Sequence, residues 1–186
     1  MQNSSPQKNR ASSRNNGNDL VILAVDPGYD RLGVAILKED SKTRKSTLLF
    51  SDCIVTDKKN QHEDRLAIVG REIAKLIETW QPSEIAVEEL FFSKNQTTAL
   101  LVSQALGVVI YESAKSGVKV FYYKPVEVKV AVTGYGKSDK SHVTSMVPKL
   151  VNMTATGNKK RLDDEYDAIA VGLTHLACRQ RNILKK

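Results

Sequence analysis

Acidic side chains follow or begin three segments that are expected to form regular structure. Asp26 follows the continuous apolar run of residues 20–25, and Glu88 follows a shorter apolar run. Asp164 and Asp167 lie three residues apart, a spacing that places both on one face of a helix. Four carboxylates in one site would repel one another and would need bound cations. Oxygen ligands select Mg²⁺ or Mn²⁺, and two such ions about 4 Å apart can direct water against a phosphodiester.

Each of these acids also has a simpler interpretation. Asp26 precedes a Pro-Gly pair, which is ordinary turn chemistry. Glu88 and Glu89 could both be solvated, and only one of them can point toward Asp26, because successive strand residues face opposite sides. The acids at 163–165 would complement a helix dipole. Asp167 is harder to explain in this way, since it lies one turn further in, where the helix should become buried and a carboxylate needs a partner.

The apolar pattern predicts the elements that would position these acids. Strands are expected over residues 20–25, 32–37, 46–55, 84–89 and 118–123. Helices are expected over residues 65–80, 97–114, 126–132, 140–151 and 163–179, with Pro148 shortening or kinking the fourth. Short links between the first three strands favour antiparallel pairing. The sequence therefore predicts a mixed α/β sheet with helices on its faces.

Length and composition suit one domain with a full hydrophobic core. The chain has 186 residues, of which 41% are hydrophobic. Residues 1–18 are basic and nearly devoid of apolar side chains, which predicts a disordered tail before a single domain over 19–181 and a short basic tail over 182–186. The role of the first tail is left open.

The net charge of +7 favours a polyanionic partner such as nucleic acid. The sequence contains neither an apolar stretch long enough to span a membrane nor a secretory h-region, so no membrane association is expected. Cys53 and Cys178 lie far apart, without metal-ligand spacing, which is typical of a reduced, cytoplasmic protein.

Four segments, in order along the chain, carry a resemblance to a known family. They are AVDPG at 24–28, AVEELFFSKN at 86–95, SQALG at 103–107 and DEYDAIAVGLTH at 164–175. Together they resemble the RuvC family of Holliday-junction resolvases over about residues 20–178. The resemblance implies a ribonuclease-H-like fold, with a mixed five-stranded sheet flanked by helices. It also implies that Asp26, Glu88, Asp164 and Asp167 are the catalytic, metal-binding acids, and it selects Glu88 over Glu89.

The resemblance implies DNA-binding residues as well. An aromatic side chain that matches Phe91 would stack in the distorted junction, although Phe92 beside it remains an alternative and either could be a core residue. The segment 124–140 is rich in lysine and glycine, and a single lysine there is most simply solvated. As a group, these lysines could neutralise phosphates beside the metals. The DNA-binding candidates are Phe91, Lys94, Lys129, Lys137 and Lys140, with Lys129 and Lys140 favoured by the resemblance.

The function expected from this resemblance is a Mg²⁺-dependent endonuclease, with Mn²⁺ as a possible substitute and two ions in each active site. It would resolve four-way junctions by paired symmetric nicks as a homodimer joined through the helix at 97–114. RuvA and RuvB, a junction-binding protein and a branch-migration motor, would be its partners. The main alternative is a ribonuclease-H-like nuclease with another nucleic-acid substrate. A sugar-kinase or actin-like ATPase would need a second Asp-x-Gly motif downstream, and a catalytically dead binder has no reason to retain four acids near a polyanion.

Overall fold

The computed structural model of the protein describes residues 19–90, 96–157 and 159–183. The predicted tail over 1–18 lies outside the described residues, as do Phe91, Phe92 and Lys94. The division into tail, domain and tail therefore stays a prediction. The last described helix continues to Ile183, two residues into the segment predicted as the second tail.

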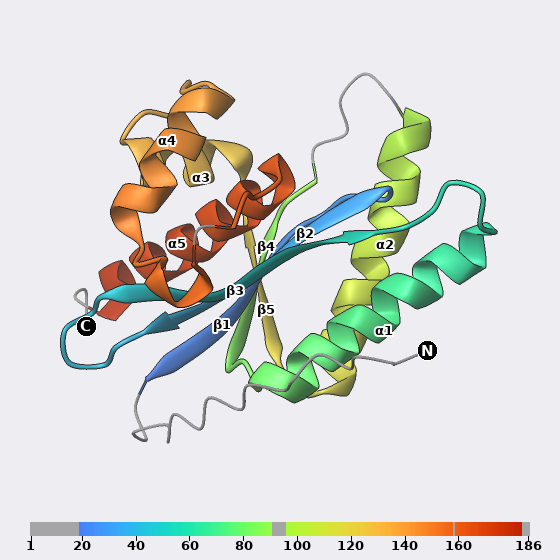
Figure 1. The fold of residues 1–186 in the computed structure, drawn as a ribbon, viewed down its shortest axis with the longest axis horizontal. Helices are drawn as coiled ribbons and strands as arrows, with labels where there is room; N and C mark the ends of the chain where they lie inside the picture. Colours follow the sequence, from blue (N-terminus) through green and yellow to red (C-terminus); the bar gives the residue numbers. More distant parts are fainter. Residues whose placement is uncertain (1–18, 91–95, 158, 184–186) are drawn as a thin grey trace, which may run out of the picture.

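A mixed five-stranded sheet forms the centre of the described chain, as predicted (Figure 1). Its strands are β1 (Leu20–Asp26), β2 (Arg31–Glu39), β3 (Ser46–Val55), β4 (Glu84–Glu88) and β5 (Lys119–Tyr123). They are ordered β3-β2-β1-β4-β5, with antiparallel pairs β1–β2 and β2–β3 and parallel pairs β1–β4 and β4–β5. Because β1 is central and covered on both faces, it is apolar at every position before Asp26.

Helices cover both faces of this sheet (Figure 1). One face carries α1 (His62–Trp80) and α2 (Gln96–Lys115), and the other carries α3 (Pro125–Thr133), α4 (Lys140–Leu150) and α5 (Asp163–Ile183). A short 3₁₀ turn, Thr154–Thr156, precedes α5. None of the described helices combines the length and the apolar character that a membrane span requires.

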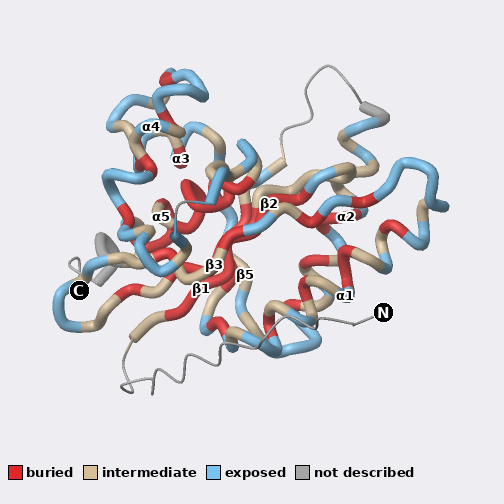
Figure 2. The backbone as a smooth tube through the Cα atoms, in the orientation of Figure 1, coloured by how far each residue is buried: buried red, intermediate tan, exposed pale blue. Residues whose placement is uncertain are grey.

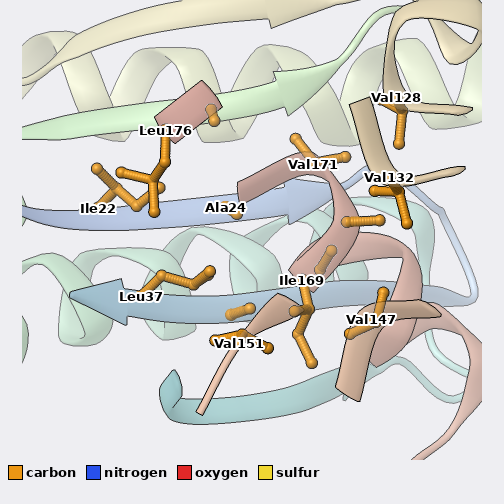
Figure 3. Close-up of a cluster of buried hydrophobic side chains, with 14 of the residues drawn as sticks. Ile22, Ala24, Leu37, Val128, Val132, Val147, Val151, Ile169, Val171 and Leu176 are labelled. Atoms are coloured by element: carbon orange, nitrogen blue, oxygen red, sulfur yellow. The ribbon is translucent and has the colours of Figure 1, made fainter. Parts of the chain in front are cut away.

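Two buried clusters lie on opposite sides of the sheet, and Figure 2 shows the buried backbone running between the helical layers. Figure 3 shows the cluster under α5, where Ile169, Val171 and Leu176 meet side chains of β1 and β2. Gly172 permits this close packing, since a Cβ there would lie 2.6 Å from Leu37 Cδ1 and 3.1 Å from Ala24 Cβ. The tight contact positions the first turn of α5 over the edge of the sheet at which β1 ends.

Candidate active site

Asp26 and Glu88 come to the same edge of the sheet because β1 and β4 are parallel neighbours. Val25 pairs with Val87, so the next residue of each strand is an acid. Both acids are partly buried, whereas Glu89 is exposed. The structure thus places Glu88, rather than Glu89, beside Asp26.

Asp164 reaches this edge through a glycine in β2. Gly33 pairs with Asp26 across the antiparallel ladder. A Cβ on Gly33 would lie 2.0 Å from the Asp164 carbonyl oxygen and 3.3 Å from Asp164 Cβ. The first turn of α5 therefore packs directly on the backbone beside Asp26, and Asp167 follows one helical turn later.

A second contact holds the start of α5 against β3. The buried Glu165 accepts a hydrogen bond from Ser51 Oγ at 2.7 Å and one from the Leu162 amide at 3.1 Å. Lys159 Nζ lies 3.0 Å from the same carboxylate. Glu165 is thus engaged in docking the helix, which leaves its neighbours Asp164 and Asp167 to face the strand ends.

The pKa values of the strand-end acids reflect how closely the negative charges gather. Burial, and then repulsion by neighbouring carboxylates, raises the pKa of Asp26 to about 8. These neighbours are Asp167, Glu88 and Asp164, in decreasing order of effect. Burial and repulsion by Asp167 raise the pKa of Glu88 to about 7, although two nearby lysines act in the opposite direction. All four predicted acids are therefore electrostatically coupled in one site.

Two cations pair with the acids of α5. Arg31 Nε lies 3.2 Å from Asp164 Oδ2, and Lys140 Nζ lies 2.9 Å from Asp167 Oδ2. Burial alone would lower the pKa of Lys140, but its pairing with Asp167 outweighs burial and raises that pKa. Lys140 stays protonated at neutral pH as a result, and it stands directly beside the acids.

The predicted lysines differ in their distance from the acids. Lys129 and Lys140 line a pocket of about 200 Å³ whose walls also include Glu88 and Asp167. Lys137 is exposed in the loop between α3 and α4 and does not line this pocket. Phe91 and Lys94, the other two DNA-binding candidates, lie outside the described residues.

A network anchored on α1 holds the turn that follows Asp26. The buried Arg65 donates to Thr56 Oγ1 at 2.9 Å, to the Tyr29 carbonyl at 3.2 Å and to Asp30 Oδ1 at 2.6 Å. Its guanidinium also lies 3.7 Å from the centroid of the Tyr29 ring. Tyr29 in turn hydrogen-bonds His62 Nδ1 at 2.7 Å. These contacts fix the backbone directly after the strand-end acid.

Comparison with known proteins identifies the family. A profile described as crossover junction endodeoxyribonuclease RuvC matches residues 22–175. The chain belongs to the RuvC family of crossover junction endodeoxyribonucleases. RuvC of Ruminiclostridium cellulolyticum is 37% identical over 156 residues, covering 84% of this chain and 91% of the relative. RuvC of Moorella thermoacetica is 40% identical over 156 residues, covering 84% and 90%.

Solved structures agree with this assignment. RuvC of Thermus thermophilus superposes with a TM-score of 0.77 at 29% identity, covering 87% of this chain and 96% of that one. The same Thermus protein has also been solved in complex with a Holliday junction substrate. The yeast mitochondrial Holliday junction resolvase Ydc2, at 11% identity and a TM-score of 0.60, shares the fold. The predicted ribonuclease-H-like fold of the RuvC family is confirmed.

The donor set of this RuvC-family site suits hard divalent ions, because its coupled ligands are all carboxylate oxygens. Asp164 Oδ2 is buried and lacks a hydrogen-bond partner, as expected for an oxygen that acts as a metal ligand. Within the described part of the chain, no three acidic, histidine or cysteine side chains converge into a ready-made ion site. In this arrangement Asp164 and Asp167 pair with Arg31 and Lys140, and the carboxylates repel one another.

Stability of the RuvC-family protein should depend on pH and divalent ions together. Both raised pKa values exceed those of unfolded carboxyl groups, so the folded protein holds more protons between about pH 4 and pH 8. Its unfolding free energy should therefore fall as pH rises through that window. Ions that bind only the folded state offset this loss. We expect 5 mM Mg²⁺ to raise the Tm by roughly 3–6 °C at pH 8 and by at most about 1 °C at pH 6.

Differential scanning calorimetry in EDTA and in Mg²⁺ measures this effect. In Asp26→Asn, the Mg²⁺-induced rise in Tm should differ less between pH 8 and pH 6, because the carboxyl group with the most strongly raised pKa is then missing. An equal Mg²⁺ effect at both pH values would contradict the coupled cluster.

Three residues of the site were not predicted from the sequence. Gly33 interrupts the apolar strand at 32–37, and an isolated glycine in a strand often marks a close backbone approach. Arg65 lies on a helix face that otherwise buries apolar residues, a signal of a paired internal charge. Arg31 follows the Asp-Pro-Gly turn and carries no local pattern that singles it out.

Proposed function

We propose that this RuvC-family endonuclease resolves four-way Holliday junctions by paired symmetric nicks. The observation that carries the proposal is the electrostatic coupling of Asp26 with Glu88, Asp164 and Asp167 at one sheet edge. Family membership and the junction-bound Thermus relative supply the substrate class. A ribonuclease-H-like nuclease with another substrate could share the acids, but the family match favours the junction.

In this proposal the four acids are the catalytic ligands of two divalent ions, Mg²⁺ or alternatively Mn²⁺. Bound there, the ions would activate water and stabilise the leaving oxygen of an in-line displacement. The protein's own contribution is to hold the carboxylates on β1, β4 and α5, which are rigid elements locked by the packing of Gly33 and Gly172. Lys129 and Lys140, beside the acids, would bind the phosphates that flank the cut.

Other DNA contacts are proposed further from the acids. Lys137 is exposed beyond the pocket and would neutralise a more distant phosphate. Phe91 would stack on a base at the junction, and Lys94 would bind a phosphate of the DNA backbone. The assignment of Phe91 rests on the family resemblance, with Phe92 as the alternative stacking residue, and Lys94 is the weaker candidate.

A homodimer would supply two sites for two matched cuts, since a four-way junction is close to two-fold symmetric. On α2, an exposed stripe supports this arrangement. It consists of Leu100, Gln104, Gly107, Tyr111 and Ala114. Leu100 is 60% exposed and Tyr111 63%, and a Cβ on Gly107 would meet no atom within 4 Å among the described residues. Cytoplasmic action with RuvA and RuvB is proposed from the family alone.

Cleavage of synthetic DNA tests the function. A labelled four-way junction with Mg²⁺ should be nicked at symmetric positions on two opposing strands, leaving 5′-phosphate ends. Duplex, flap and RNA–DNA hybrid substrates of the same sequence should be cut at least about a hundredfold more slowly, because only the junction presents two correctly spaced strands. Faster cutting of the hybrid or the flap would favour the alternative substrate.

A further inference from the structure

Arg31 begins β2 on the side of the sheet that α5 covers. Alternation places it on the same face as Gly33 and Leu37. Gly33 is in contact with the Asp164 backbone, and Leu37 packs in the cluster under α5. Arg31 is therefore directed by the strand itself toward the first turn of α5, where Asp164 lies.

The contact between Arg31 and Asp164 is an ion pair of an unusual kind. Arg31 Nε lies 3.2 Å from Asp164 Oδ2, yet that buried oxygen has no partner in hydrogen-bonding geometry. The Arg31 side chain is 52% exposed, whereas that of Asp164 is 18% exposed. The guanidinium thus neutralises Asp164 from the solvent side without being locked to it. Such a pair is weak and readily exchanged.

An ion at the acids would compete with this arrangement. A divalent cation bound through Asp164 Oδ2 would be positive, as the Arg31 guanidinium is. The two cations would repel each other and compete for the same oxygen. Arg31 would then be displaced toward solvent, at the mouth of a site whose substrate is a polyanion. Guanidinium groups bind phosphate oxygens well, with up to five N–H donors.

We propose that Arg31 is an exchangeable counter-ion, which pairs with Asp164 in the ion-free protein and with a DNA phosphate once divalent ions are bound. The inference rests on the proposed function, since it takes ions and DNA as the ligands of the acids. In this way Arg31 couples the binding of the two ligands. Ion binding releases a phosphate-binding group, so each ligand affects the affinity for the other.

The first experiment measures ion binding without DNA. Mn²⁺ is titrated into metal-free protein and free Mn²⁺ is followed by electron paramagnetic resonance. Arg31→Gln should bind Mn²⁺ roughly threefold to tenfold more tightly than wild type, because the competing charge is gone. Arg31→Lys, which keeps the charge, should stay within about twofold of wild type. Arg71→Gln on α1, across the sheet from α5, is the matched control and should change nothing.

The second experiment measures junction affinity by fluorescence anisotropy, in EDTA and in Ca²⁺. Ca²⁺ is the probe ion because its loose coordination suits binding better than in-line attack. Arg31→Gln should weaken binding about fivefold in saturating Ca²⁺ and by no more than about twofold in EDTA. Arg71→Gln should change neither value.

Three outcomes would overturn the exchange. Unchanged or weaker Mn²⁺ binding by Arg31→Gln would mean that Arg31 orients Asp164 or plays no part. Equal losses of junction affinity in EDTA and Ca²⁺ would make Arg31 a permanent phosphate contact. Equal gains in Mn²⁺ affinity by Arg31→Gln and Arg31→Lys would exclude charge as the cause. Failure of wild type to prefer the junction over duplex would count against the proposed function instead, and the Mn²⁺ titration would still decide the role of Arg31.

Discussion

Asp26→Asn should reduce junction cleavage by about a thousandfold or more and, at pH 8, make the protein more stable. A metal-binding acid contributes several kcal/mol to charge stabilisation in the transition state, and about 4 kcal/mol corresponds to a thousandfold in rate. The same carboxylate destabilises the ion-free fold, because burial and repulsion raise its pKa to about 8. Removing its charge should raise the unfolding free energy at pH 8 by about 1–3 kcal/mol.

Single-turnover cleavage of a labelled junction and denaturant unfolding in EDTA measure the two effects. Junction binding should be kept, since the lysines are untouched. Asp40→Asn is the matched control, because Asp40 follows the end of β2 that lies away from the four acids. Its carboxylate accepts hydrogen bonds from the Thr43 and Lys42 amides, which lower its pKa. That variant should cut normally and be slightly less stable at pH 8. If Asp26→Asn instead cut at the wild-type rate, Asp26 would be the simple turn residue that its Pro-Gly neighbours suggest.

Local periodicity was enough to predict the described strands and α-helices and their type, although not the short 3₁₀ turn before α5. The unbroken apolar run before Asp26 reflects a strand buried on both faces, and the short links correctly predicted antiparallel pairing of the first three strands. Element ends were less predictable. Helix α4 continues past Pro148 to Leu150, although proline removes a donor and crowds the preceding turn, because the flanking Val147 and Val151 are buried in the core. Helix α1 begins at His62, three residues before the apolar pattern does.

The site could be predicted as far as it follows from the ends of elements. Parallel neighbours bring their last residues to one edge, and a spacing of three brings two helix residues to one face; the positions of Asp26, Glu88, Asp164 and Asp167 follow from these rules. His175, which ends the last of the four family segments, has a structural role instead, because it is buried between Tyr123 Oη and Glu84 Oε2, each at 2.7 Å.

Contacts between distant elements could not be predicted in the same way. The pairing of Arg31 with Asp164 joins residues more than a hundred positions apart. It depends on the angle at which α5 crosses β2, which no local pattern encodes. Arg65 is a similar case, since its partners lie on two turns that meet only in the folded protein.

Gly33→Ala should disrupt the site without removing any of its acids. The added methyl group would lie 2.0 Å from the Asp164 carbonyl oxygen, which belongs to the backbone and cannot rotate away. The start of α5 would have to shift by more than an ångström, against the packing of Gly172 on Leu37 further along the helix. Overpacking of this kind typically costs about 1–3 kcal/mol of stability, and a clash with backbone should lie at the upper end of that range. Displacement of the acids by about 1 Å should lower cleavage roughly a hundredfold.

Urea unfolding, single-turnover cleavage and Mn²⁺ titration of the same variant separate these effects. Arg71→Ala on α1 is the control, since this residue is exposed on the helix across the sheet from α5 and alanine is the residue that most favours helix. It should be as stable as wild type or more so. Because Gly33→Ala keeps all four carboxylates, weakened Mn²⁺ binding in the folded variant can arise only from their displacement. A variant as stable and active as wild type would mean that α5 does not rest on β2 at Gly33, and the geometric basis for grouping the helix acids with the strand acids would be lost.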